Sequence, residues 1–130
     1  DLLIDSVGND KLFGGKHNDL IRGGNDDDLI EGEDGNDKIS GGNGNDAINA
    51  GEGNDEVSAE NGEDIINGGS GNDKLDGGSD NDLIHGNNGN DIINGKAGDD
   101  TLFGDQGIDS INGHSGTDMC DGEIEINCEI

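Results

Sequence analysis

The sequence predicts an all-β fold, a flattened parallel β-solenoid in which nine-residue units stack into two short sheets. Three observations predict it: an aspartate recurs every nine residues without a miss, one apolar residue follows each aspartate by two positions, and glycines flank this pair at fixed places. A repeat of fixed period is the sequence signature of a solenoid, so the period decides the fold class before local propensities are considered.

The repeating aspartates form what we call the aspartate ladder, and Asp1 also falls in its register. Its thirteen members are Asp10, Asp19, Asp28, Asp37, Asp46, Asp55, Asp64, Asp73, Asp82, Asp91, Asp100, Asp109 and Asp118. The apolar position begins at Leu12 and Ile21 and ends at Cys120. A flexible acidic tract would drift in phase and would show no preference for Ile or Leu at one position, and neither feature is seen.

Each unit divides into a strand and a turn. Around Asp-x-Ile-x, side chains alternate between faces, so the Ile or Leu points inward and its neighbours point outward. The glycine-rich half supplies the left-handed backbone of a tight turn. Two units then make one full turn of the solenoid, and ladder aspartates eighteen residues apart lie above one another at the ~4.8 Å spacing of neighbouring strands.

The composition excludes several classes of protein. Six Lys and Arg residues against 32 Asp and Glu give a net charge of −26, and only 26% of the residues are hydrophobic. Such a charge repels nucleic acid and anionic membranes and favours cations as partners. No stretch approaches a transmembrane span. An ordinary globular core cannot be built from this composition, so we expect the chain to be disordered without a bound cation.

The cleanest units read GGNGNDAIN over 41–49 and GGSGNDKLD over 68–76. They resemble the hemolysin-type (RTX) calcium-binding nonapeptide repeat, and the resemblance extends from Asp1 to Gly122. The resemblance implies a parallel β-roll, a β-solenoid with Ca²⁺ along both loop edges, unfolded at cytosolic Ca²⁺ and folded at extracellular Ca²⁺. A secreted module of a toxin, protease, lipase or adhesin is the implied setting.

Stacked carboxylates explain why calcium would be needed. At ~5 Å two carboxylates repel by about 1 kcal/mol in water and by several times more at a lower dielectric. Ca²⁺ prefers six to eight oxygen ligands, whereas Mg²⁺ demands a tight octahedron and Zn²⁺ prefers nitrogen and sulfur. One edge, the Asp10 edge, contains Asp10, Asp28, Asp46, Asp64, Asp82, Asp100 and Asp118; the other, the Asp19 edge, contains Asp19, Asp37, Asp55, Asp73, Asp91 and Asp109. Their six and five intervals predict about eleven Ca²⁺ ions. Asp26 and Asp80 replace a glycine on the Asp10 edge, which predicts weaker or rearranged sites beside them.

The register breaks after Gly122, so we divide the chain into a β-roll over residues 1–122 and a C-terminal capping or contact strand over 123–130. The tail alternates apolar and polar residues, and its apolar face (Ile124, Ile126, Cys128, Ile130) is expected to cover the open end of the core. A Cys120–Cys128 disulfide would fix this cap and indicate an oxidising compartment. Two unpaired, buried cysteines are the alternative.

No catalytic residue set is present, so we expect no enzyme. The glycine loops lack the Lys-Ser/Thr of a phosphate-binding loop, and the Ser and Thr residues lack a partnered base. We expect a secreted, extracellular or cell-surface protein whose partners are calcium ions and either flanking domains of a larger protein or further copies of itself. The alternative function is a structural protein polymerising end to end into Ca²⁺-stabilised filaments. An outward apolar row with Leu29, Ile65, Leu83 and Met119 is either a contact surface or a consequence of strand propensity.

Overall fold

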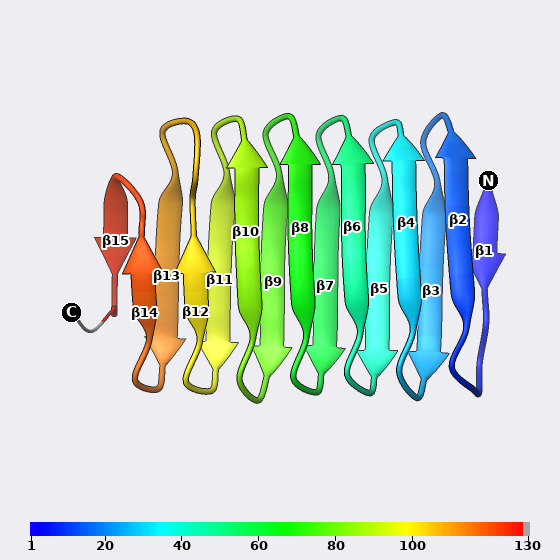
Figure 1. The fold of residues 1–130 in the computed structure, drawn as a ribbon, viewed down its shortest axis with the longest axis horizontal. Helices are drawn as coiled ribbons and strands as arrows, with labels where there is room; N and C mark the ends of the chain where they lie inside the picture. Colours follow the sequence, from blue (N-terminus) through cyan, green and yellow to red (C-terminus); the bar gives the residue numbers. More distant parts are fainter. Residues whose placement is uncertain (129–130) are drawn as a thin grey trace.

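A computed structural model describes residues 1–128, and within them the chain forms an all-β solenoid of about seven turns built from two parallel sheets. The sheets face each other along the whole stack, and the first strand, β1, and the last, β15, lie at opposite ends of it (Figure 1). The predicted fold class is therefore confirmed.

Successive strands alternate between the sheets, so each sheet takes every second unit. The sheet that we call sheet A contains β1 (Leu2–Ile4), β3 (Leu20–Asn25), β5 (Lys38–Asn43), β7 (Glu56–Asn61), β9 (Lys74–Ser79), β11 (Ile92–Ala97), β13 (Ser110–Ser115) and β15 (Ile124–Ile126). Sheet B contains β2 (Lys11–Lys16), β4 (Leu29–Asp34), β6 (Ala47–Glu52), β8 (Ile65–Ser70), β10 (Leu83–Asn88), β12 (Thr101–Phe103) and β14 (Met119–Asp121).

The register between neighbouring strands is eighteen residues, as the repeat predicts, everywhere except between β13 and β15. Ile39 pairs with Val57, for example, and Val57 pairs with Leu75. Within each sheet, this register stacks the inward aliphatic residues into a column, and the two columns lie between the sheets. The core residues are Leu12, Ile21, Ile30, Ile39, Ile48, Ala50, Val57, Ala59, Ile66, Leu75, Ile84, Ile93, Leu102 and Ile111. The core is thus one aliphatic side chain per unit, supplemented by two alanines.

The strands are longer than the sequence indicates, because in most units the glycine-rich positions after the inward aliphatic residue lie within the strand. In β8, Gly68 and Gly69 follow Ile66 in the paired segment, which leaves only residues 71–73 for the turn to β9. Gly68 belongs to the inward positions, alternating with Asp64 and Ile66, and a Cβ there would lie 2.8 Å from the carbonyl oxygen of Gly86. Close stacking of turns therefore leaves little room at this position, and the only side chains found there in these strands are the methyl groups of Ala50 in β6 and Ala59 in β7.

The turn itself needs a left-handed residue. Gly71 has φ 134° and follows directly on the strand, and its amide bonds the carbonyl of Asn88 on the next turn at 2.8 Å. Where this position is not glycine, φ is smaller but still positive: His17, Asp26 and Asp80 have φ of 80°, 74° and 76°. The repeat therefore imposes the turn even on residues that disfavour it.

The C-terminal segment departs from the expected cap. β15 pairs in parallel with β13, Ser110 with Ile124 and Asn112 with Ile126, so the tail continues sheet A as a further strand. The expectation that Ile124 and Ile126 cover the open core end is wrong, since they are 52% and 50% exposed. Ile130, the last member of that expected apolar face, lies outside the described residues.

A disulfide joins Cys120 of β14 to Cys128, with 5.8 Å between their Cα atoms. Both cysteines are partly buried and pack against the end of the aliphatic core. The disulfide expected from the sequence is therefore present, and unpaired cysteines are excluded. It ties the tail to the last strand of sheet B.

Candidate calcium-binding edges

The thirteen ladder aspartates lie at the two edges of the solenoid, immediately before the strands. Those of the Asp19 edge precede the strands of sheet A, and those of the Asp10 edge precede the strands of sheet B. Their side chains point inward: the twelve from Asp19 to Asp118 are no more than 4% exposed, and Asp10 in the first turn is less buried. The sequence placed these residues on the correct edges.

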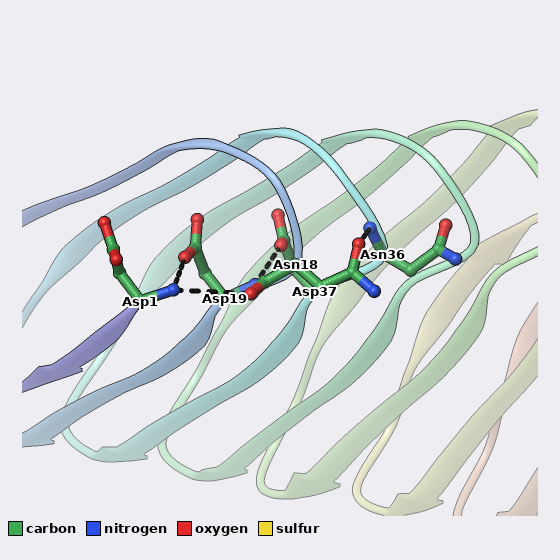
Figure 2. Close-up of polar contacts among 5 residues, drawn as sticks. All are labelled: Asp1, Asn18, Asp19, Asn36 and Asp37. Carbon is green, nitrogen blue, oxygen red and sulfur yellow. Dashed lines mark hydrogen bonds and ion pairs between the residues drawn. The ribbon is translucent and has the colours of Figure 1, made fainter.

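One carboxylate oxygen of each ladder aspartate from Asp19 to Asp118 accepts a hydrogen bond from the preceding turn. The amide of Asp19 donates to Oδ1 of Asp37 at 2.8 Å, and the N-terminal amine of Asp1 contacts Oδ1 of Asp19 in the same way (Figure 2). The same bond recurs at every interval from Asp10 to Asp118, with distances between 2.7 and 3.0 Å. The ladder is thus physically continuous along both edges.

The second carboxylate oxygen, Oδ2, is buried without a hydrogen-bond partner in all thirteen aspartates. A buried ionised oxygen without a partner is strongly unfavourable, so a regular row of them calls for a ligand. The recurrence along both edges shows that this is a property of the repeat and not a local accident.

The glycine positions bring pairs of oxygen atoms close together. A Cβ built on Gly68 would lie 2.6 Å from Oδ2 of Asp73 and 2.8 Å from the carbonyl oxygen of Gly86 on the next turn. Both acceptors therefore lie against the same side of Gly68, close enough for one cation beside the glycine to contact both. The same convergence occurs at Gly14, Gly23, Gly32, Gly41, Gly77, Gly86 and Gly95. A cation between the oxygens is the arrangement that removes this conflict.

Burial makes the carboxylates hard to ionise without a cation. It raises the pKa of Asp46, Asp55, Asp64 and Asp73 to about 6, outweighing the hydrogen bond from the neighbouring turn, which lowers the pKa. Burial raises the pKa of Asp82 further, to about 7, and the nearby carboxylate of Asp80 adds to the effect. At neutral pH the metal-free edges therefore hold charge that the fold itself does not compensate.

The donor chemistry fits a hard cation. Each interval offers aspartate carboxylate and backbone carbonyl oxygens, the ligand set that Ca²⁺ prefers. Among the described residues no three His, Cys, Asp or Glu side chains converge on one point, so an ion here would draw much of its shell from the backbone. Such a set is poorly suited to Zn²⁺.

A second ladder was missed by the sequence analysis. On the Asp19 edge, asparagine precedes every aspartate except Asp109. The amide of Asn36 donates to Oδ1 of Asn18 at 2.9 Å (Figure 2), and the pattern continues through Asn54, Asn72 and Asn90. These bonds run opposite in direction to those of the aspartates. The available signal was the recurrence of asparagine at an eighteen-residue period, which the nine-residue frame concealed.

The outer faces differ between the sheets. On sheet B, Leu29, Ala47, Ile65 and Leu83 pair side by side across β4 to β10, so the outward apolar row is continuous. Ile65 is 48% exposed, and Met119 further along is 57% exposed. On sheet A, Glu56 lies between Lys38 and Lys74, at 3.0 and 3.7 Å. Sheet B therefore presents the more apolar face.

These features define a calcium-binding β-solenoid, and the comparison with protein families agrees with the geometry. The model of the RTX calcium-binding nonapeptide repeat matches residues 1–30, 22–57, 40–75, 58–93, 67–102 and 94–124. The chain belongs to this family of structural calcium-binding repeats. None of the curated proteins compared with the chain matches it. Among residues 1–128 there is no helix long and apolar enough to cross a membrane.

Proposed function

We propose that this chain is a calcium-responsive module that folds when Ca²⁺ binds between its turns. The thirteen ladder aspartates are the proposed ligands, together with the carbonyl oxygens that face them. The observation that supports this most strongly is the unpartnered Oδ2 row, buried along both edges. About eleven intervals of this kind lie between successive aspartates, and eleven dications would offset most of the net charge of −26.

Folding and binding are proposed to be a single event. The core contributes one aliphatic side chain per nine residues, and the ladder carboxylates oppose folding unless they are neutralised. A cation that binds only the folded state adds its binding free energy to stability, so the chain would be folded where Ca²⁺ is abundant. The function is then structural, and no catalytic role is proposed.

We propose an extracellular setting for this role. Proteins with these repeats are typically secreted, and the Cys120–Cys128 disulfide is stable in an oxidising compartment. We propose that the chain is the secretion or structural module of an exported protein, unfolded before export and folded outside. The alternative is a protein that polymerises end to end into filaments.

Sedimentation velocity in millimolar Ca²⁺ and in chelator tests the proposal and separates the two candidates. A folding module becomes compact in Ca²⁺ and stays monomeric as its concentration rises. An end-to-end polymer shows a series of larger species that grows with concentration. A sedimentation coefficient unaffected by Ca²⁺ would contradict both.

A further inference from the structure

The last turn of the Asp19 edge is completed by a residue outside the nine-residue register. The amide of Asp109 donates to Oε2 of Glu123 at 2.9 Å, whereas the amide of Asp91 donates to Oδ1 of Asp109, the ladder aspartate eighteen residues on. Glu123 follows Asp109 by only fourteen residues. We propose that Glu123 is a calcium ligand that replaces the next ladder aspartate and adds a sixth interval to this edge. The inference rests on the proposed function.

The strand pairing places Glu123 at the ladder position. Every ladder aspartate of the Asp19 edge directly precedes the first residue of a sheet A strand, as Asp109 precedes Ser110. Ser110 pairs with Ile124, and Glu123 directly precedes Ile124. The amide of Ile124 bonds the carbonyl of Asp109 at 3.1 Å, as the amide of Ser110 bonds that of Asp91 at 2.9 Å. Although the spacing from Asp109 to Glu123 is four residues shorter than the repeat, Glu123 occupies the position of the next ladder aspartate.

The interval between Asp109 and Glu123, like the others, contains a buried carboxylate oxygen that has no hydrogen-bond partner. Asp109 is fully buried, and its Oδ2 has no hydrogen-bond partner. On the previous turn, the corresponding Oδ2 of Asp91 lies on the side of the carbonyl of Gly104, which belongs to the following turn. At Gly104 the three nearest atoms all belong to Asp109, including Oδ2 at 2.5 Å, whereas at Gly86 the carbonyl oxygen of the next turn is among them. The exposed side chain of Glu123 is therefore the oxygen donor that the next turn presents to this interval. A carboxylate on each side of this interval is the arrangement of every other interval of the edge.

The tail supplies a substitute donor on the opposite edge as well. A Cβ on Gly113 would contact Oδ2 of Asp118 and the carbonyl oxygen of Asn127, the position held elsewhere by the carbonyl of the next turn. Asn127 has φ 53°, a left-handed backbone like that of the repeat turns. Residues 123–127 thus reproduce donors of a further turn on both edges without the repeat sequence.

The disulfide holds this segment in place. β15 is a three-residue strand with Ile124 and Ile126 half exposed, so apolar burial fixes it weakly. The Cys120–Cys128 bond closes a loop that contains both Glu123 and Asn127. The covalent link therefore restrains the two substitute donors against the last repeat turn.

Native mass spectrometry of the Ca²⁺-saturated chain tests the assignment. Glu123→Gln keeps an oxygen that accepts the Asp109 amide but loses the charge, so a purely structural Glu123 would tolerate it. Glu31→Gln, in the first half of β4, is the control with the same change in charge, because Oε2 of Glu31 accepts a hydrogen bond from Asn49 at 2.7 Å and Gln keeps that acceptor. We expect Glu123→Gln to bind one Ca²⁺ fewer than the wild type, and Glu31→Gln to bind the wild-type number.

Two further outcomes bear on the proposal. Glu123→Asp keeps the carboxylate and is expected to retain the ion. Equal ion counts for wild type and Glu123→Gln, or loss of the ion in both Glu123 variants, would overturn the assignment while the repeat sites still fill. A wild-type chain that binds no Ca²⁺ would instead contradict the proposed function itself.

Discussion

The amide of Asp55 donates to Oδ1 of Asp73 at 2.9 Å, and Oδ2 of the same Asp73 carboxylate, fully buried, accepts no hydrogen bond. One carboxylate thus serves two intervals: it binds the preceding turn through Oδ1 and faces the following turn through Oδ2. Because this relationship recurs along both edges, the loss of one aspartate affects two neighbouring intervals. Several consequences can be measured.

An interior ladder position is expected to matter more than a terminal one. Asp73→Asn keeps an oxygen for the Asp55 amide but removes the charge shared by two intervals, so the Ca²⁺ concentration at the folding midpoint should rise several-fold. Asp118→Asn affects the last repeat interval and should raise it less. Circular dichroism titrations of the two variants provide the comparison, and equal midpoints would contradict the sharing of ligands.

The pH dependence of the metal-free chain follows from the raised carboxyl pKa values. In Asp55 and Asp73 the pKa rises from 3.8 when unfolded to about 6 when folded, so the folded state favours the protonated form. This contribution is fully present below about pH 4 and is lost as the pH rises through 6, by at most about 3 kcal/mol per aspartate. In chelator the chain should therefore contain more β structure at pH 5 than at pH 8.

With calcium present, folding is expected to become less favourable as the pH falls, the reverse of the metal-free chain. Protons compete with Ca²⁺ for the carboxylates, so the midpoint Ca²⁺ concentration should rise as the pH falls from 7 to 5. Titrations at several pH values measure this shift. A midpoint independent of pH would show that the ladder carboxylates are not the ligands.

A side chain larger than a methyl group beside the two oxygens should impair binding, since only Gly or Ala occupies this position in the strands of the repeat. In Gly68→Val the added Cβ lies 2.6 Å from Oδ2 of Asp73 and 2.8 Å from the carbonyl of Gly86, the two oxygens expected to share an ion. The Ca²⁺ midpoint should rise, whereas Asn67→Val, at the outward position next to it, should change it little. Equal midpoints for Gly68→Val and wild type would place the ion elsewhere.

The Cys120–Cys128 disulfide predicts how the protein reacts with an alkylating reagent. Alkylation of the unreduced protein should leave the intact mass unchanged, because Cys120 and Cys128 are bonded to each other. Reduction before alkylation should add two labels. Two labels without reduction would show that the bond does not form in solution.

The repeat predicts the architecture, but it does not predict where each strand ends or how the last turn is built. The phase of the aspartates specifies the eighteen-residue register, both edges and the aliphatic columns, because close stacking permits no drift. The strand conformation of Gly68 was not predictable from the low strand propensity of glycine, because glycine is favoured there by the close approach of the Gly86 carbonyl on the next turn. Likewise, Glu123 takes a ladder position although it follows Asp109 by fourteen residues and not eighteen, and a search at a fixed period does not detect such a residue.

Far-UV circular dichroism of the intact chain, titrated with Ca²⁺ at pH 7.5 from a chelated start, tests the central claim most directly. Coupled binding and folding predicts a disordered spectrum in chelator and a cooperative rise of β structure with Ca²⁺, with Mg²⁺ at the same concentrations far less effective. A full β spectrum in chelator, unchanged by Ca²⁺, would contradict it, because the buried carboxylates would then be tolerated without a cation.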